Sequence, residues 1–159
     1  MRAVLSAFIL SASLIAAPAG AQSLKAGDGW KLAATPHAFG ALVENVEKAI
    51  ADNKMGLVFK ASASANVKAR MNEDIPGNAV IGVFRPDFAK RMLAASIASG
   101  IEAPVRFYIT ENADKTATLS WRTAGSVFQP YMAEGGDGLK AVAAELDSIL
   151  AKIAEEAVK

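Results

Sequence analysis

Arg85 is the first residue in this sequence whose position suggests chemistry. It stands directly before Pro86 and Asp87, between an apolar run and a helix-like run. This join would place a guanidinium at the amino end of a helix, where unpaired backbone N–H groups already attract negative charge. A carboxylate or phosphate ligand could bind there, and Asp87 in the first turn could neutralise the same charge without a ligand. We favour the structural interpretation and keep Arg85 as a ligand-binding candidate.

Three further candidates lie on one face of a predicted β-hairpin. Apolar and polar residues alternate over residues 105–110 and again over 117–122, with turn residues at 112–115. The polar side chains that project from the same side are Arg106, Tyr108, Thr118, Ser120 and Arg122, and the ligand-binding candidates among them are Arg106, Tyr108 and Arg122. Two guanidiniums beside hydroxyls would suit a shallow pocket for an anionic small molecule or a dimer surface. An ordinary solvated sheet face is the third interpretation.

A metal or haem site would have to use the single histidine. Imidazole and thioether groups suit copper(I) and haem, and His37 is accompanied by four methionines besides Met1: Met55, Met71, Met92 and Met132. No Met-x-Met or His-x-Met spacing occurs, and Met92 belongs to an apolar helix stripe. We therefore expect no metal and no cofactor, and we keep a periplasmic metal- or haem-binding protein as the alternative function.

Patterns typical of enzymes are missing from the sequence. One histidine and no cysteine exclude a Cys–His nucleophile pair and a multi-histidine metal centre. There is no Gly-x-Ser-x-Gly, no Gly-x-Gly-x-x-Gly and no Gly-Lys-Ser/Thr phosphate loop. The glycine-rich run at 135–138 is better interpreted as a loop and helix cap. We name no catalytic residue and expect a binding domain rather than an enzyme.

Apolar residues that recur every three or four positions predict three helices to hold these side chains. Each begins at a capping residue or a proline. The predicted helices run from Thr35-Pro36 to Asn53, from Pro86 to Gly100, and from a cap at Asp137 through Ile153. Residues 63–70 are ambiguous and could form a short helix, whereas 71–78 read as a loop.

Strands are predicted at residues 30–34, 57–62 and 79–84, in addition to the hairpin. The segment 79–84 shows no polar alternation, so we expect it in the middle of the sheet with both faces covered. Helices that each carry one apolar stripe must lie on a sheet. The sequence therefore predicts an α+β fold with two layers, a mainly antiparallel or mixed sheet packed against about three helices.

The first residues predict export. Arg2, a nearly uncharged run over residues 3–18 and the small residues Ala19-Gly20-Ala21 are typical of a secretory signal peptide. We expect cleavage between Ala21 and Gln22, a periplasmic location, and one domain over residues 22–159. The mature chain would have 16 basic and 16 acidic residues, because only Arg2 is lost from 17 and 16. A net charge of zero predicts no nucleic-acid partner and no membrane attachment after cleavage.

The stretch 38–123 resembles the bacterial domain-of-unknown-function family 302 (DUF302), with the TT1751-like fold. The resemblance rests on "KMGLVFKASASANVKA", "AVIGVFRP" and "SGIEAPVRFYITENADKTATLSW", in this order. Phe84-Arg85-Pro86 replaces the Gly-Asn-Pro that is frequent in the family. The resemblance implies a compact α+β fold and raises a homodimer as an expectation, and it supplies no activity. We expect an exported module that binds an unknown small molecule or protein.

Overall fold

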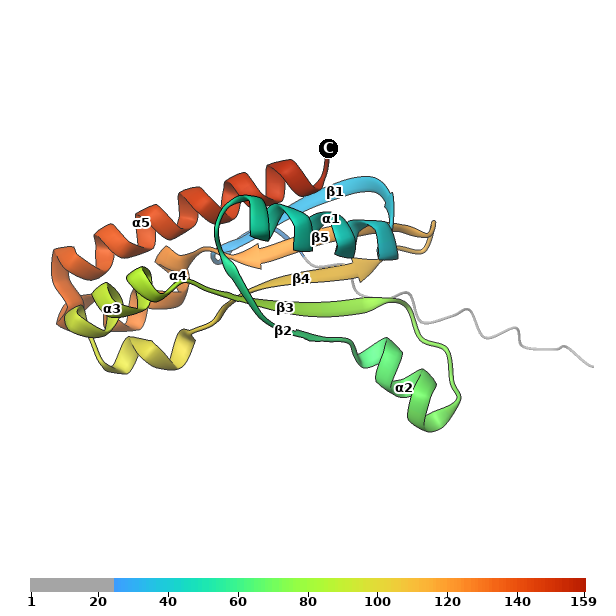
Figure 1. The fold of residues 1–159 in the computed structure, drawn as a ribbon, viewed down its shortest axis with the longest axis horizontal. Coiled ribbons are helices and arrows are strands. Elements are labelled where there is room, and N and C mark those ends of the chain that lie inside the picture. The colour runs from blue at the N-terminus through green and yellow to red at the C-terminus, as the bar shows by residue number, and fades with distance from the viewer. Residues whose placement is uncertain (1–24) are drawn as a thin grey trace, which may run out of the picture.

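The computed structural model describes residues 25–159, so the predicted signal peptide and its cleavage point lie outside the described residues. Strands and helices alternate along most of the chain (Figure 1). The strands are β1 (Trp30–Ala38), β2 (Gly56–Ala61), β3 (Asn78–Phe84), β4 (Val105–Glu111) and β5 (Thr116–Arg122). The α-helices are α1 (Phe39–Asp52), α2 (Ala63–Met71), α3 (Pro86–Ala95), α4 (Ala124–Phe128) and α5 (Met132–Ala157). Two 3₁₀ turns, η1 (Ala98–Glu102) and η2 (Gln129–Tyr131), complete the list.

The five strands form one sheet in the order β1-β5-β4-β3-β2, and every neighbouring pair is antiparallel. The predicted hairpin is β4 and β5, with Phe107 opposite Trp121. β3 pairs with the other side of β4, where Ile81 lies opposite Phe107. The α+β fold class is confirmed, and of the two predicted kinds of sheet the antiparallel one is correct.

Helices cover one face of the sheet. α1 packs against all five strands, and α5 packs along α1, α3 and α4. Leu42, Met92 and Leu146 represent the three predicted apolar stripes, and each is at most 4% exposed. Met92 and Leu146 line a small void together with Val83 of the sheet. The three predicted stripes are therefore buried in one core with the strands.

On the opposite face of the sheet, α2 is the helix beside the strands. α2 contacts β3 and has no buried residue. In Figure 1 it extends beyond the ends of β2 and β3, away from α1 and α5. β3 lies inside the sheet as predicted, but the prediction that both its faces are covered is wrong: Val80 lines a groove on the side away from α1.

The predicted helix start at Thr35-Pro36 is also wrong. β1 continues to Ala38, and its register with β5 shifts between Thr35 and Ala38. Pro36 has no N–H to donate, and an irregularity on an edge strand tolerates that loss. The Thr35 hydroxyl accepts a hydrogen bond from the His37 N–H at 2.8 Å, which helps to close the bulge. Proline therefore marks a bulge here rather than the first turn of a helix.

Two other helix limits differ from the predicted ones. α3 ends at Ala95 because Ser96 is extended, and Gly100 lies in η1 instead of ending the helix. The last helix begins at Met132 and is interrupted at Gly136, whose φ of 52° is not helical. The carboxylate of Asp137 accepts from Lys140 at 3.1 Å instead of capping the helix.

Candidate anion-binding site

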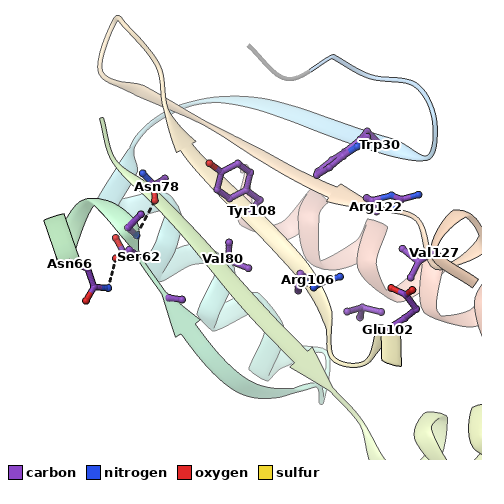
Figure 2. A pocket seen from close by; sticks show the side chains of 13 residues that line it. Trp30, Ser62, Asn66, Asn78, Val80, Glu102, Arg106, Tyr108, Arg122 and Val127 are labelled. Atoms are coloured by element: carbon purple, nitrogen blue, oxygen red, sulfur yellow. Dashed lines mark hydrogen bonds between the residues drawn. The ribbon is translucent and has the colours of Figure 1, made fainter. Parts of the chain in front are cut away.

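A groove of about 690 Å³ lies on the side of the sheet away from α1, and we call it the open-face groove. Its size is typical of small-molecule sites in proteins. Figure 2 shows that its side chains come from several strands and from the segments beside them. The lining residues are Trp30, Ala61, Ser62, Ala63, Asn66, Asn78, Val80, Glu102, Val105, Arg106, Tyr108, Arg122 and Val127.

The strand register brings the three hairpin candidates into this groove. On β4 and β5, Tyr108 pairs with Ser120 and Phe107 with Trp121, so the register places Arg106 opposite Arg122 one step further along. Arg122 also pairs with Trp30 on β1. Because side chains alternate between the faces of a strand, all of them project to the same side. Figure 2 shows Trp30 and Arg122 together on neighbouring strands, with Arg106 on the next strand.

Both arginines lack a carboxylate partner within residues 25–159. The Arg106 side chain makes neither an ion pair nor a hydrogen bond there, and the Arg122 side chain donates only a long bond of 3.4 Å to the Ser126 hydroxyl. Glu102, the acidic residue that lines the groove, accepts instead from the Tyr131 hydroxyl at 3.0 Å. Like charges at opposed strand positions repel each other. This end of the groove therefore has positive charge that an anion would neutralise.

The polar groups at the opposite end of the groove already have partners. Asn78 accepts from the Ala63 N–H at 3.1 Å and donates to the Pro76 carbonyl at 3.2 Å. The Asn66 amide donates to the Ser62 carbonyl at 2.7 Å. The bond from Ala63 to Asn78 attaches the start of α2 to β3, and the other two are local to each segment. Together these residues form the groove wall shown on one side of Figure 2.

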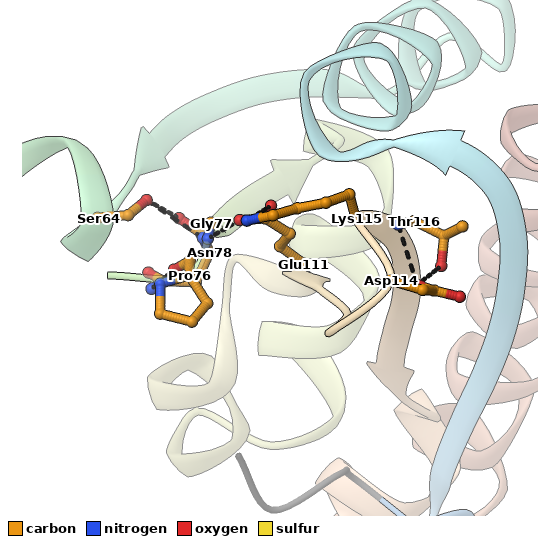
Figure 3. Close-up of polar contacts among 8 residues, drawn as sticks. All are labelled: Ser64, Pro76, Gly77, Asn78, Glu111, Asp114, Lys115 and Thr116. Carbon is orange, nitrogen blue, oxygen red and sulfur yellow. Dashed lines mark hydrogen bonds and ion pairs between the residues drawn. The ribbon is translucent and has the colours of Figure 1, made fainter. Parts of the chain in front are cut away.

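A second set of contacts holds the loop that leads into β3 (Figure 3). The Glu111 carboxylate accepts from the Gly77 N–H at 2.7 Å and pairs with Lys115 at 2.8 Å. The Gly77 hydrogen bond, followed by that of Lys115, lowers the pKa of Glu111 below its usual value. The Ser64 hydroxyl accepts from the Asn78 N–H at 3.2 Å. The position of α2 beside the groove therefore depends on Glu111 and Ser64.

Arg85 lies away from the open-face groove and has a local partner. Its guanidinium donates two hydrogen bonds to Asp87, at 2.7 and 3.0 Å, and lies 4.2 Å from the centre of the Phe88 ring. The hydrogen bond from Arg85 lowers the pKa of Asp87. This geometry corresponds to the structural interpretation of the join, in which Asp87 neutralises the arginine.

The groups named for a metal or haem site are separated in the fold. His37 lies on the edge strand β1, whereas Met71 ends α2 beyond the opposite edge strand β2. Met55 and Met92 lie in the hydrophobic core. Within residues 25–159, no group of three His, Cys, Asp or Glu side chains is placed to hold a metal ion. His37 Nε2 is buried and has no hydrogen-bond partner among the described residues.

Sequence reasoning missed Trp30 and the α2 wall as parts of the site. Trp30 was expected in a strand, but the sequence does not show that this strand lies beside β5. Asn66 lies in the ambiguous segment 63–70, and Asn78 ends the predicted loop 71–78. The signal in the sequence for this wall is the two asparagines that follow one apolar strand and precede the next. Asparagine is equally common at turns and helix caps, so it does not indicate a site.

An antiparallel sheet with helices on one face and a groove on the other defines an open-faced α+β domain. The family model for the domain of unknown function DUF302 matches residues 32–157, and the chain belongs to this family. This match confirms the resemblance seen in the sequence.

A solved structure has the same fold. The uncharacterized conserved protein DUF302 from Bacillus stearothermophilus superposes with a TM-score of 0.71 at 14% identity, over 82% of this chain and 98% of that one. A search of curated proteins finds no match. No helix in the described part of the chain is both long and apolar enough to cross a membrane.

Proposed function

We propose that this chain is an exported periplasmic domain that binds a small anionic molecule in the open-face groove. The observation that carries the proposal is the pair Arg106 and Arg122, adjacent on one sheet face and without carboxylate partners in the described chain. Each guanidinium can donate two parallel hydrogen bonds to a carboxylate or phosphate. Trp30 and Tyr108 offer flat apolar surface beside that charge.

Export is part of the proposal because of the leader sequence. Arg2, the apolar run and Ala19-Gly20-Ala21 support secretion with cleavage after Ala21. A domain of this kind would carry its ligand in the groove rather than transform it, since no Cys–His pair or phosphate-loop motif accompanies the two arginines.

Native mass spectrometry of the protein purified from the periplasm of its own cell tests the proposal. We expect a mass that lacks residues 1–21 and a bound small molecule that Arg106→Gln and Arg122→Gln both lose. Arg85→Gln is the matched control, because this arginine lies outside the groove and is neutralised by Asp87. An adduct that persists in both groove variants, or none in the unmodified chain, would contradict ligand binding in the groove.

The same spectra test two further predictions. A homodimer would double the measured mass, and a resident metal or haem would add a mass that persists in Arg106→Gln and disappears in His37→Ala. The second result would favour the metal- or haem-binding alternative over the anion site.

A further inference from the structure

The open-face groove is polar in two different ways at its two ends, and this difference restricts the ligand. We infer that the ligand is an amphipathic monocarboxylate, with its carboxylate on Arg106 and Arg122 and an apolar tail that runs over Val80 toward α2. This inference rests on the proposed function and names the substrate class of the same site.

The head group follows from the charge balance at one end. Two guanidiniums and one carboxylate, Glu102, line this part of the groove, so the site has an excess of one positive charge. Tyr131 already donates to Glu102 at 3.0 Å, whereas Arg106 has no partner in the part of the chain that the structure describes. A single carboxylate balances the excess and accepts hydrogen bonds from both guanidiniums.

The tail follows from the middle of the groove and its far end. Between the arginines and α2 the floor is apolar, made by Val80, Ala61 and the ring of Tyr108. The side-chain amides of Asn66 and Asn78 beyond it already have hydrogen-bond partners in Ser62, Pro76 and the Ala63 N–H. Lys68 on α2 pairs with Asp74 at 2.7 Å. Among the described residues that line the groove, the cations are Arg106 and Arg122 at the other end, so no lysine or arginine lines the far end to bind a second carboxylate.

The register gives the length of the tail. Arg106 lies four residues from Thr110, which is opposite Asn78 at the α2 end. Four residues of β-strand span about 14 Å, which corresponds to an extended chain of about ten carbons. Each methylene that leaves water in such a groove should strengthen binding by about two- to fourfold.

Titration calorimetry on the full mature chain tests the inference with four probes: butyrate, decanoate, decanedioate and decyltrimethylammonium. Decanoate has six more methylenes than butyrate, so we expect it to bind at least about sixtyfold more tightly than butyrate, and more tightly than the dicarboxylate. We expect no binding of the cationic probe. Arg106→Gln and Arg122→Gln should each weaken decanoate binding about tenfold or more, because each removes charge-assisted hydrogen bonds.

Two variants on the exposed strand β2 test the direction of the tail. Ala61→Leu adds bulk at a lining position of the groove and should shift the preferred chain length to a shorter acid, with butyrate binding unchanged. Val58→Leu is the matched control, because it adds a methylene on the same strand at a residue that does not line the groove. Both positions are exposed, so the fold should tolerate either change.

The outcomes separate the two proposals. Equal affinity for butyrate and decanoate, with both lost in Arg106→Gln, would overturn the apolar tail and leave the anion site intact. Equal affinity for decanoate and decanedioate would also overturn the single-headed ligand. Binding of decanoate that Arg85→Gln reduces as much as Arg106→Gln would overturn the placement of the carboxylate. If none of the anionic probes binds to the unmodified chain, the proposed function itself would be overturned.

Discussion

The two faces of the sheet are built from the same strands and have opposite characters. On β4, Phe107 and Ile109 point under α1 and are fully buried, whereas Arg106 and Tyr108, one position away, line the open-face groove. A single step along the strand changes a core residue into a binding candidate because successive side chains point to opposite faces. One face of the sheet supplies stability, and the other is left free for a ligand.

The largest expected change in stability comes from truncating a side chain on the buried face, compared with its neighbour on the open face. Phe107→Ala should lower the free energy of unfolding by about 3–5 kcal/mol, because it removes a buried ring and leaves a cavity. Tyr108→Ala, its neighbour on the other face, should cost about 1 kcal/mol. Chemical denaturation of both variants measures the difference. Similar losses would show that the open face is part of the core.

A smaller effect is expected at Gly82, where the open face is closely packed against one ring. A Cβ added there would overlap the Phe59 ring, so the ring would have to move. We expect Gly82→Ala to cost roughly 1–2 kcal/mol. Adding Phe59→Ala should remove the clash and recover part of the loss. A double variant less stable than the sum of the two single variants would contradict this explanation.

The smallest expected effect is a pH dependence at the support of the α2 wall. The pKa of Glu111 is lowered by the Gly77 N–H and Lys115, so its ionised form is bound more strongly in the folded state. Its contribution to stability is therefore present above the ordinary glutamate value of 4.5 and is lost as the pH falls through the lower folded pKa.

Urea denaturation of the unmodified chain and of Glu111→Gln between pH 7 and pH 3 measures this contribution. The pKa values of Asp87, Asp114 and Glu145 are also lowered, so both proteins should lose stability in acid. The gap between the two curves should narrow below pH 4.5. A constant gap would mean that the Glu111 carboxylate does not support the loop through its charge.

The sequence is most informative where the pattern of neighbouring residues determines the face to which a side chain points. Alternation over the hairpin placed Arg106, Tyr108 and Arg122 on one face, and the structure has all three in the open-face groove. Alternation does not specify which strand lies alongside, so the pairing of Trp30 with Arg122 was not predicted. Such a long-range neighbour depends on the packing of the whole chain.

Proline is an ambiguous signal in this sequence for a physical reason. The fixed φ and missing N–H of Pro36 suit both a first helical turn and a bulge on an edge strand. At Pro86 the same signal was correct, and α3 begins there. Pro36 differs from Pro86 because β1 continues its pairing with β5 past Thr35. Since β5 is remote from Pro36 in the sequence, the local pattern does not indicate this pairing.

The bulge at Pro36 also affects the tendency of separate copies of this protein to pair through their edge strands. An unprotected outer strand is a template on which further chains can assemble into fibres. At one border of the sheet the proline removes a donor, and at the other the ladder is irregular between Leu57 and Phe59, next to the charged Lys60. Growth by strand addition is thus discouraged at both borders, and the domain should resist aggregation even when concentrated.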